Sequence, residues 1–229
     1  GCRKEKVMPH MQMPPVAAAL FDVDGVLVDS KAAYIGFYNA VLEHVGLPAM
    51  TVEEEVRIFS FTFEDGFNHL IPPALRMRGR QYVDAARFED SLPHIRPMAG
   101  ALEGLARLKA HGLKLGVCTN GARREVDVVF RTYGIAPLVH AIVTCDEAPR
   151  PKPHPDGLLL LLDLLAVPRE QAVYIGDSPA DEQAARAAGV EFWSFRSPNL
   201  KAARELWHHE EVVQAVAGRS TVPIGRMAP

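Results

Sequence analysis

Four short hydrophobic runs, each followed by polar residues, indicate an alternation of strands and helices along this chain. The runs cover residues 16–21, 113–118, 141–143 and 172–175. They lack polar alternation, and continuous hydrophobicity of this kind is typical of parallel strands that are covered on both faces. Between and after the later runs, hydrophobic residues at helical spacing predict helices at 99–111, 122–133, 156–165 and 179–188. The pattern therefore predicts βαβ units and an α/β fold with a doubly wound parallel sheet.

One long interval interrupts this alternation, between the first predicted strand and the helix at 99. Within it, helical patterns cover residues 31–45, 51–58, 64–70 and 74–88, separated by a turn with Gly and Pro, a Phe-rich turn and a Pro-Pro turn. Such an interval is far longer than a βα loop. We therefore expect residues 31–95 to form an inserted helical cap over the strand ends, and residues 14–30 with 96–229 to form the α/β core. The basic start, residues 1–13, is expected to be disordered or vector-derived.

The composition excludes several classes of protein. Of 229 residues, 48% are hydrophobic and 23% are charged, which is typical of a globular domain. A net charge of −3 provides no broad nucleic-acid-binding surface, and the longest hydrophobic stretch, 158–165, is far short of the ~20 residues that span a bilayer. The three cysteines have no C-x-x-C spacing, which argues against a disulfide framework and structural zinc. We expect a cytoplasmic protein, a monomer or homodimer, that binds neither nucleic acid nor membrane.

Two carboxylates follow the first predicted strand, in the segment that begins with Asp22, Val23, Asp24 and Gly25. If the strand continued, both acidic side chains would point the same way. At ~4 Å and an effective dielectric constant of ~20 they would repel each other by about 4 kcal/mol. This pair therefore indicates a bound cation, although an ordinary loop rich in Asp and Gly would have the same letters.

The other strand ends carry groups that suit an anion and a metal. Thr119, Asn120 and Gly121 provide a hydroxyl, an amide and free backbone N–H groups where a helix begins. Lys152 lies between two prolines, and Asp177 and Asp181 flank a strand-to-helix turn. Each feature alone has an ordinary explanation, such as a helix cap or a solvated lysine. Together they indicate a site for a phosphate dianion and a metal ion.

In this order and spacing, the four segments resemble the haloacid dehalogenase (HAD) superfamily, in its phosphatase and phosphomutase branch with a small helical cap. The resemblance extends from about Val16 to Trp193 and implies a Rossmann-like core. It implies that Asp22 is the nucleophile and Asp24 the general acid and base, an acid that dehalogenases lack. The remaining roles that it implies are phosphate binding by Thr119, Asn120, Gly121 and Lys152, Mg²⁺ binding by the Asp22 and Asp177 carboxylates with the Asp24 carbonyl, and outer support by Asp181 and Ser178.

The chemistry of the residues agrees with these roles. A carboxylate that attacks a phosphate dianion faces like charge, so Mg²⁺ and the Lys152 ammonium must first neutralise the dianion. Asp22 would then become an acyl phosphate, which divides the displacement into two easier steps. Asp24 would protonate the leaving oxygen and later deprotonate water, roles that favour a raised pKa.

The expected substrate is a small phosphorylated metabolite such as a phosphoglycolate- or sugar-phosphate-like monoester. In the cap we select Arg57 as a candidate substrate-binding residue, and expect the phenylalanines of segment 59–67 to pack the cap. Three alternatives stay open: a phosphomutase of the β-phosphoglucomutase type, a receiver-like phospho-acceptor module, and a serine hydrolase with its nucleophile at Ser178. The pair His208 and His209 is expected to be solvated.

Overall fold

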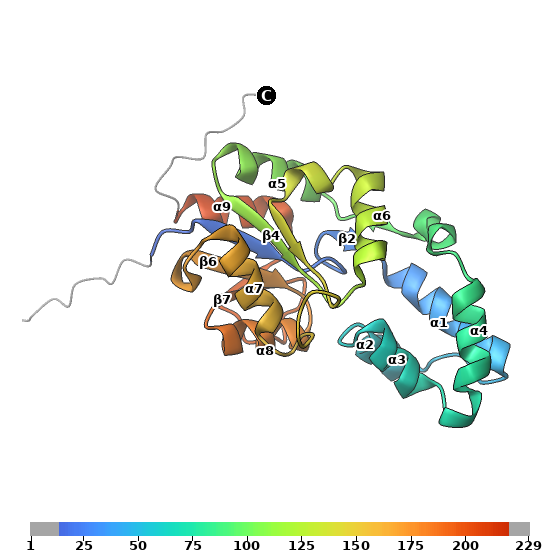
Figure 1. The fold of residues 1–229 in the computed structure, drawn as a ribbon. Helices are drawn as coiled ribbons and strands as arrows, with labels where there is room; N and C mark the ends of the chain where they lie inside the picture. The colour runs from blue at the N-terminus through green and yellow to red at the C-terminus, as the bar shows by residue number, and fades with distance from the viewer. Residues whose placement is uncertain (1–13, 220–229) are drawn as a thin grey trace, which may run out of the picture.

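A computed structural model describes residues 14–219, and at its centre lies a six-stranded parallel sheet (Figure 1). Its strands are β1 (Ala18–Phe21), β4 (Lys114–Cys118), β5 (Ala141–Val143), β6 (Ala172–Gly176), β7 (Glu191–Phe195) and β8 (Arg204–Leu206). The order is β5-β4-β1-β6-β7-β8, so the chain first builds outward from one side of β1 and then from the other. This confirms the predicted α/β fold. The expectation for residues 1–13 lies outside the described residues.

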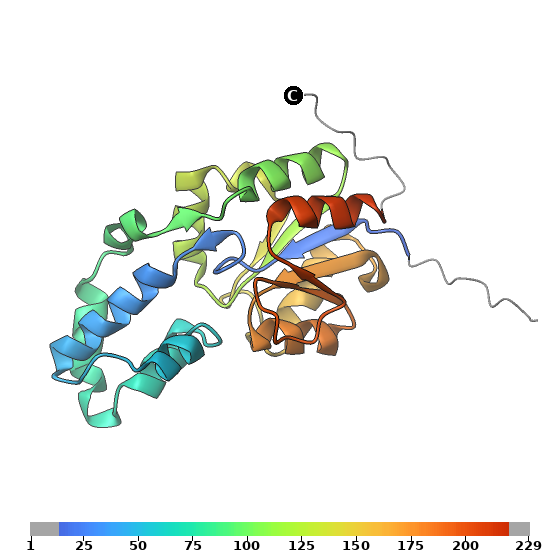
Figure 2. The ribbon, with the colours of Figure 1, turned by 180° about the vertical axis from the view of Figure 1, so that it is seen from behind.

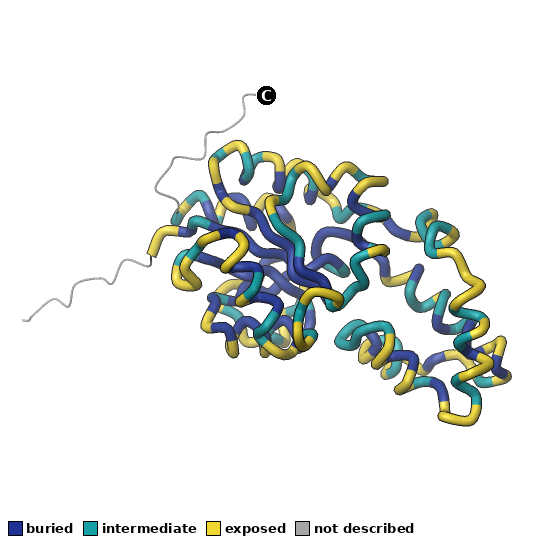
Figure 3. Tube along the Cα trace, viewed as in Figure 1, coloured by how far each residue is buried: buried dark blue, intermediate teal, exposed yellow. Residues whose placement is uncertain are grey.

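Helices cover both faces of the sheet. On one face lie α5 (Ala101–Ala110), α6 (Arg123–Tyr133) and α9 (His209–Ala217), and on the other α7 (Asp156–Leu165) and α8 (Pro179–Ala188). Strand β1 supplies both cores in alternation: Ala19 and Phe21 pack against the first group, Ala18 and Leu20 against the second. All four are fully buried, as the dark strands of Figure 3 show. Burial on both faces explains why these strands are continuously hydrophobic.

The interval after β1 forms a small helical body with its own core. Its elements are α1 (Lys31–Val45), α2 (Val52–Ile58), α3 (Phe63–Leu70), the 3₁₀ turn η1 (Pro73–Leu75), α4 (Arg76–Ala85) and the 3₁₀ segment η2 (Phe88–His94). Tyr38, Val41 and Phe67 are at the centre of this second core. The helix predicted at 74–88 ends early, at Ala85, because Phe88 and Leu92 turn back to pack against the core of the α/β body.

Two antiparallel segments connect the helical body to the sheet. The chain leaves through β2 (Val28–Asp29) and returns through β3 (Arg96–Pro97), which pair with each other beside the sheet (Figure 2). Because both connections are joined by this short ladder, we propose residues 31–95 as the cap domain and the rest of the described chain as the core.

The C-terminal part differs most from the sequence-based expectations. The hydrophobic pattern predicts neither β7, which begins with Glu191, nor β8, which is only three residues long and mostly exposed. His209 is buried, with 2% of its surface exposed, and its Nε2 lies 2.7 Å from the Val26 carbonyl oxygen. The expectation that His209 is solvated is therefore wrong, because α9 packs against the sheet. Across residues 14–219, every helix is too short or too polar to cross a membrane.

Candidate active site

The predicted site residues meet at the carboxyl ends of the central strands. Asp22 follows β1, Thr119 follows β4, Asp177 follows β6, and Lys152 comes from the loop that precedes α7. Sheet-like backbone bonds hold the first two: Asp22 N donates to the Ile175 carbonyl at 2.9 Å and Thr119 N to the Val143 carbonyl at 3.0 Å. Residues that are far apart in sequence thereby share one edge of the sheet, where α/β proteins place their ligands.

Lys152 lies at the centre of this cluster and is buried, with 6% of its surface exposed. Its Nζ atom is 2.8 Å from Asp22 Oδ1, 2.5 Å from Asp181 Oδ1 and 3.0 Å from the Tyr174 hydroxyl. Burial alone would lower the pKa of Lys152, but the adjacent Asp181 and Asp22 carboxylates raise it above its usual value. The ammonium group therefore stays charged next to the Asp22 carboxylate.

Asp181, in the first turn of α8, orients this lysine. It is fully buried, and its Oδ2 accepts hydrogen bonds from the Ser178 hydroxyl at 2.6 Å and the Ser178 N–H at 3.0 Å. Although burial opposes ionisation, the charge and hydrogen bond of Lys152 hold the pKa of Asp181 below its usual value. Ser178 is the N-cap of α8, so its hydroxyl is already engaged, which disfavours a serine nucleophile at this position.

Tyr174 belongs to the same network and is not among the residues predicted from sequence. Its hydroxyl lies 2.7 Å from Asp181 Oδ1, 3.0 Å from Lys152 Nζ and 3.0 Å from the Cys118 carbonyl oxygen. A signal for it exists in the sequence, because Tyr174 is the one polar side chain in the hydrophobic run 172–175. A buried tyrosine hydroxyl usually has a hydrogen-bond partner.

The Asn120 side chain links the loop after β4 to the loop of Lys152 through two hydrogen bonds. Its Nδ2 donates to the Lys152 carbonyl at 2.9 Å, and Lys152 N donates to Asn120 Oδ1 at 2.9 Å. Gly121 N lies 3.1 Å from Thr119 Oγ1. The Asn120 side chain therefore positions Lys152, and the residues of this loop line the same cavity as Asp22.

Three carboxylates are close enough to share a metal ion. Asp22, Asp177 and Asp181 each offer an oxygen atom, and these atoms lie within 4.8 Å of one another. Asp22 Oδ1 is buried and has its ion-pair contact with Lys152 but no well-formed hydrogen bond within residues 14–219. Because both Asp181 oxygens already accept hydrogen bonds, Asp22 and Asp177 are the better ligands. This all-oxygen donor set fits Mg²⁺.

Close packing at Gly25 fixes the position of Asp177. A Cβ atom at Gly25 would lie 2.0 Å from Asp177 Oδ2, so only glycine leaves room for this carboxylate. The backbone of Gly25 also has a φ of +76°, which favours glycine. On its other side, the Asp177 carbonyl accepts a hydrogen bond of 2.6 Å from the Ser197 hydroxyl.

The site carries more negative charge than its one lysine balances. Burial, followed by the charge of Asp181, raises the pKa of Asp22 to about 7. Burial also raises the pKa values of Asp24 and Asp177. A bound divalent cation would remove this penalty and favour the ionised carboxylates. The Ser30 hydroxyl donates to Asp24 Oδ1, which holds the Asp24 side chain at the edge of the cavity next to Asp22.

The cavity above these residues has a volume of about 50 Å³ and lies between core and cap. Its cap side consists of Tyr34, Tyr38, Ile58, Phe59, Phe61 and Phe63. The phenylalanines pack within the cap, as expected, and three of them also line the cavity; for example, Phe63 stacks on Tyr38 at 5.5 Å between ring centroids. From the core, Glu125 accepts a hydrogen bond of 3.3 Å from the Tyr34 hydroxyl, a contact that the sequence did not suggest.

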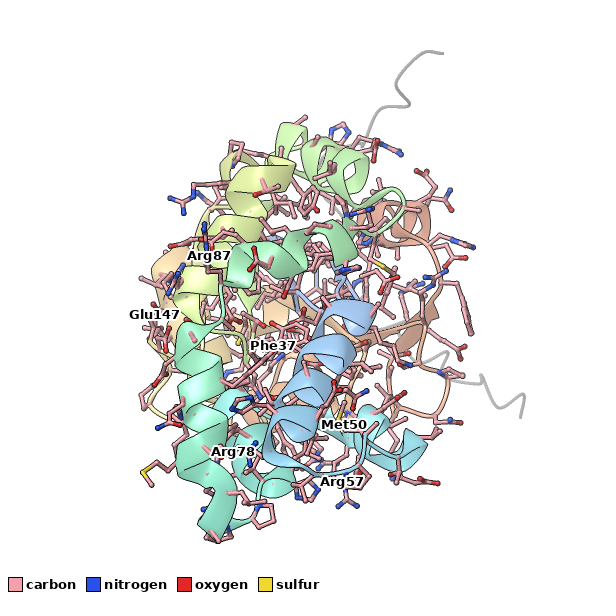
Figure 4. The ribbon with its side chains drawn as sticks, turned by 90° about the vertical axis from the view of Figure 1, so that its right-hand side faces the viewer. Phe37, Met50, Arg57, Arg78, Arg87 and Glu147 are labelled. Atoms are coloured by element: carbon pink, nitrogen blue, oxygen red, sulfur yellow. The ribbon has the colours of Figure 1, made fainter. Side chains whose placement is uncertain are left out.

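Arg57 does not line this cavity. It is exposed in the last turn of α2, and in Figure 4, which views the molecule from the cap side, it is labelled at the lower edge. Two other arginines are paired with carboxylates: Arg80 binds Glu64 at 2.6 and 2.8 Å, and Arg123 binds Glu147 at 2.9 Å.

A parallel sheet with four acidic residues and one lysine at its carboxyl edge, under a helical cap, defines a class of α/β hydrolases. Comparison with known proteins identifies the family: residues 19–195 match the family of haloacid dehalogenase-like hydrolases, so the chain belongs to it. The predicted family and its enzymatic nature are confirmed.

Relatives and solved structures agree with this assignment. The phosphoglycolate phosphatase of Rhodospirillum rubrum is 32% identical over 188 residues, which cover 76% of each protein. A subfamily IA HAD-superfamily hydrolase from Geobacter sulfurreducens is 29% identical with a TM-score of 0.73, covering 88% of this chain and 96% of that one. A HAD family hydrolase from Deinococcus radiodurans, solved with bound phosphate and sodium, is 27% identical with a TM-score of 0.67, covering 91% of this chain and 99% of that one.

Proposed function

We propose that this protein is a Mg²⁺-dependent phosphatase that hydrolyses a small phosphate monoester through an aspartyl-phosphate intermediate. One observation carries the proposal: a buried lysine lies 2.8 Å from the Asp22 carboxylate, at a sheet edge where the Asp177 carboxylate and the loop Thr119 to Gly121 meet. The similarity to phosphoglycolate phosphatases and to a hydrolase with bound phosphate supports it.

In the first step, a carboxylate oxygen of Asp22 attacks phosphorus while the bond to the ester oxygen breaks. Asp24 gives its proton to the leaving oxygen, and the alcohol departs. In the second step, water attacks the phosphorus of the aspartyl phosphate, Asp24 takes a proton from that water, and Asp22 is released with inorganic phosphate. The raised pKa of Asp24 suits a group that must both donate and accept a proton.

Charge neutralisation comes from Lys152 and from the metal. Lys152 would bind a phosphoryl oxygen beside Asp22, with Thr119 and the N–H groups of its loop on the other side. Asp22, Asp177 and the Asp24 carbonyl would hold Mg²⁺. When bound, the ion would supply positive charge that reduces the repulsion between the Asp22 carboxylate and the phosphate dianion. Asp181, which is held by Ser178, would orient the lysine.

The experiment measures released phosphate with Mg²⁺ and with EDTA for the wild type, Asp22→Asn and Asp24→Asn. Asp163→Asn, an exposed aspartate on α7, is the matched control. We expect EDTA and Asp22→Asn to abolish release, Asp24→Asn to abolish or sharply slow it, and the control to be unaffected. Wild-type turnover by folded Asp22→Asn would eliminate the mechanism.

The phosphatase, the phosphomutase and the receiver-like module predict different products. Rapid quenching with a ³²P-labelled substrate should label Asp22 during steady release of phosphate. A phosphomutase of the β-phosphoglucomutase type would return the phosphoryl group to a sugar phosphate as an isomer, which ³¹P NMR detects. A receiver-like module would become labelled without continuing release.

A further inference from the structure

Within residues 14–219, no cap residue that lines the cavity above Asp22 is cationic. All six cap residues that line the 50 Å³ cavity are aromatic or aliphatic: Tyr34, Tyr38, Ile58, Phe59, Phe61 and Phe63. The two hydroxyl groups among them are already engaged, because Tyr34 donates to Glu125 and Tyr38 donates to the Phe63 carbonyl, each at 3.3 Å. The cap side of this cavity is therefore built from aromatic and aliphatic residues.

On the core side, Lys152 is the one cation among the described residues that line this cavity. Lys152 is already engaged with Asp22 and Asp181, and the proposed mechanism uses it for the phosphoryl group. The other ionisable group beyond the acidic cluster is Glu125, whose carboxyl group would repel an anion or be neutral. Among these described residues, a second carboxylate next to the ester oxygen would thus find no cation that is not already engaged.

A neighbouring cavity provides room for a larger leaving group. It has a volume of about 370 Å³ and shares Tyr34, Phe63 and Glu125 with the first cavity, while Phe37, Val83 and Phe88 extend its apolar lining. Figure 4 shows Phe37 near the middle of the cap face. Two cationic residues line this second cavity: Arg80, which is bound by Glu64, and Arg124, which is exposed on α6.

From these linings we infer that the preferred substrates are phosphate monoesters whose leaving group is uncharged and apolar or aromatic next to the ester oxygen. A short carboxylated leaving group such as glycolate is disfavoured. The whole of 2-phosphoglycolate would lie in the small cavity, with its carboxylate against the aromatic side chains of the cap. Placing a charge there without a partner is costly, whereas an aromatic ring would be buried against rings from the cap. This inference rests on the proposed phosphatase function.

The test compares kcat/KM for benzyl phosphate and 2-phosphoglycolate, with glycerol 1-phosphate as a polar, uncharged third leaving group. The benzyl and glycerol leaving groups are both alkoxides, so the comparison does not depend on an activated phenol. We expect benzyl phosphate to exceed each of the other two by at least about tenfold, which corresponds to about 1.4 kcal/mol of transition-state binding.

Variants at Phe61 connect the preference to the cap. Phe61 lies in the short loop between α2 and α3, is partly exposed and packs on the outside of the cap core, so Phe61→Leu serves as the control for lost packing. Phe61→Arg should shift the ratio of kcat/KM values toward 2-phosphoglycolate by about tenfold, whereas Phe61→Leu should keep the preference for benzyl phosphate. Met77→Ala, exposed on α4, is the control away from both cavities, and thermal melting checks that each variant is folded.

The outcomes separate the two proposals. If no substrate is hydrolysed faster than by Asp22→Asn, the proposed function is wrong. If phosphate is released but 2-phosphoglycolate or glycerol 1-phosphate is preferred, the phosphatase function stands and the inference about the leaving group is overturned. A ratio that Phe61→Arg and Phe61→Leu change equally would also overturn it, because charge at the cap surface would then be irrelevant.

Discussion

Replacing Gly25 by alanine should disable the metal site without unfolding the protein. The added Cβ would lie 2.0 Å from Asp177 Oδ2, whereas Cβ atoms in proteins approach other atoms no closer than 3.0 Å. The Asp177 carboxylate must therefore move by about 1 Å, and a misplacement of this size can cost about 10²-fold in rate. We expect kcat/KM to fall by about that factor, and the affinity for Mg²⁺ to weaken with it.

The matched control is Gly134→Ala, at the end of α6. Gly134 has a similar φ, +71° against +76°, but a Cβ there would meet nothing within 4 Å. Both variants should therefore lose about 1–2 kcal/mol of stability from the left-handed backbone. Only Gly25→Ala should also lose Mg²⁺ affinity, measured by isothermal titration calorimetry, and activity. If the two variants bind Mg²⁺ equally well, the proposed role of the Gly25 contact is refuted.

Two further predictions concern stability. Tyr174→Phe removes a hydroxyl that contacts Lys152 and Asp181, so urea unfolding should show that the free energy of unfolding falls by about 1–3 kcal/mol. The control Tyr82→Phe, in the cap, should change it by less than about 0.5 kcal/mol. Equal losses in the two variants would contradict the role of the Tyr174 hydroxyl. Burial, followed by the charge of Asp181, raises the pKa of Asp22 to about 7 in the folded protein. As pH rises from about 4 to 7, Asp22 therefore loses its proton in the unfolded chain before it does so in the folded protein, which favours unfolding. In EDTA the wild type should therefore lose stability over this range, and Asp22→Asn should lose less; an identical pH dependence in both proteins would refute this assignment.

Much of the architecture could be predicted because the sheet is buried on both faces. Helices α7 and α8 have the predicted bounds, 156–165 and 179–188, and the strand at 141–143 is also as predicted. Continuous hydrophobic runs and helical spacing respond to burial, which is a local property of each element. Strands β7 and β8 escaped prediction because one begins with a charged residue and the other is short and mostly exposed.

The acidic motif and the polar strand ends likewise predicted from sequence which residues meet at the edge of the sheet. Parallel strands bring their carboxyl ends to one edge, so Asp22, Thr119 and Asp177 had to lie near one another once the sheet was predicted. Spacing carries no such information about the cap, where Arg57 is a candidate by residue type alone. The structure instead brings Phe59, Phe61 and Phe63 to the cavity.

The amino-acid sequence by itself therefore determined the parallel sheet, the insertion after its first strand and the charged groups at its edge. Only the tertiary structure decided that Tyr174 and Asp181 contact Lys152, that Gly25 makes room for Asp177, and which cap residues line the cavity. The physical reason is distance along the chain. Hydrophobic periodicity records whether a residue is buried, but contacts between remote segments depend on how the elements pack.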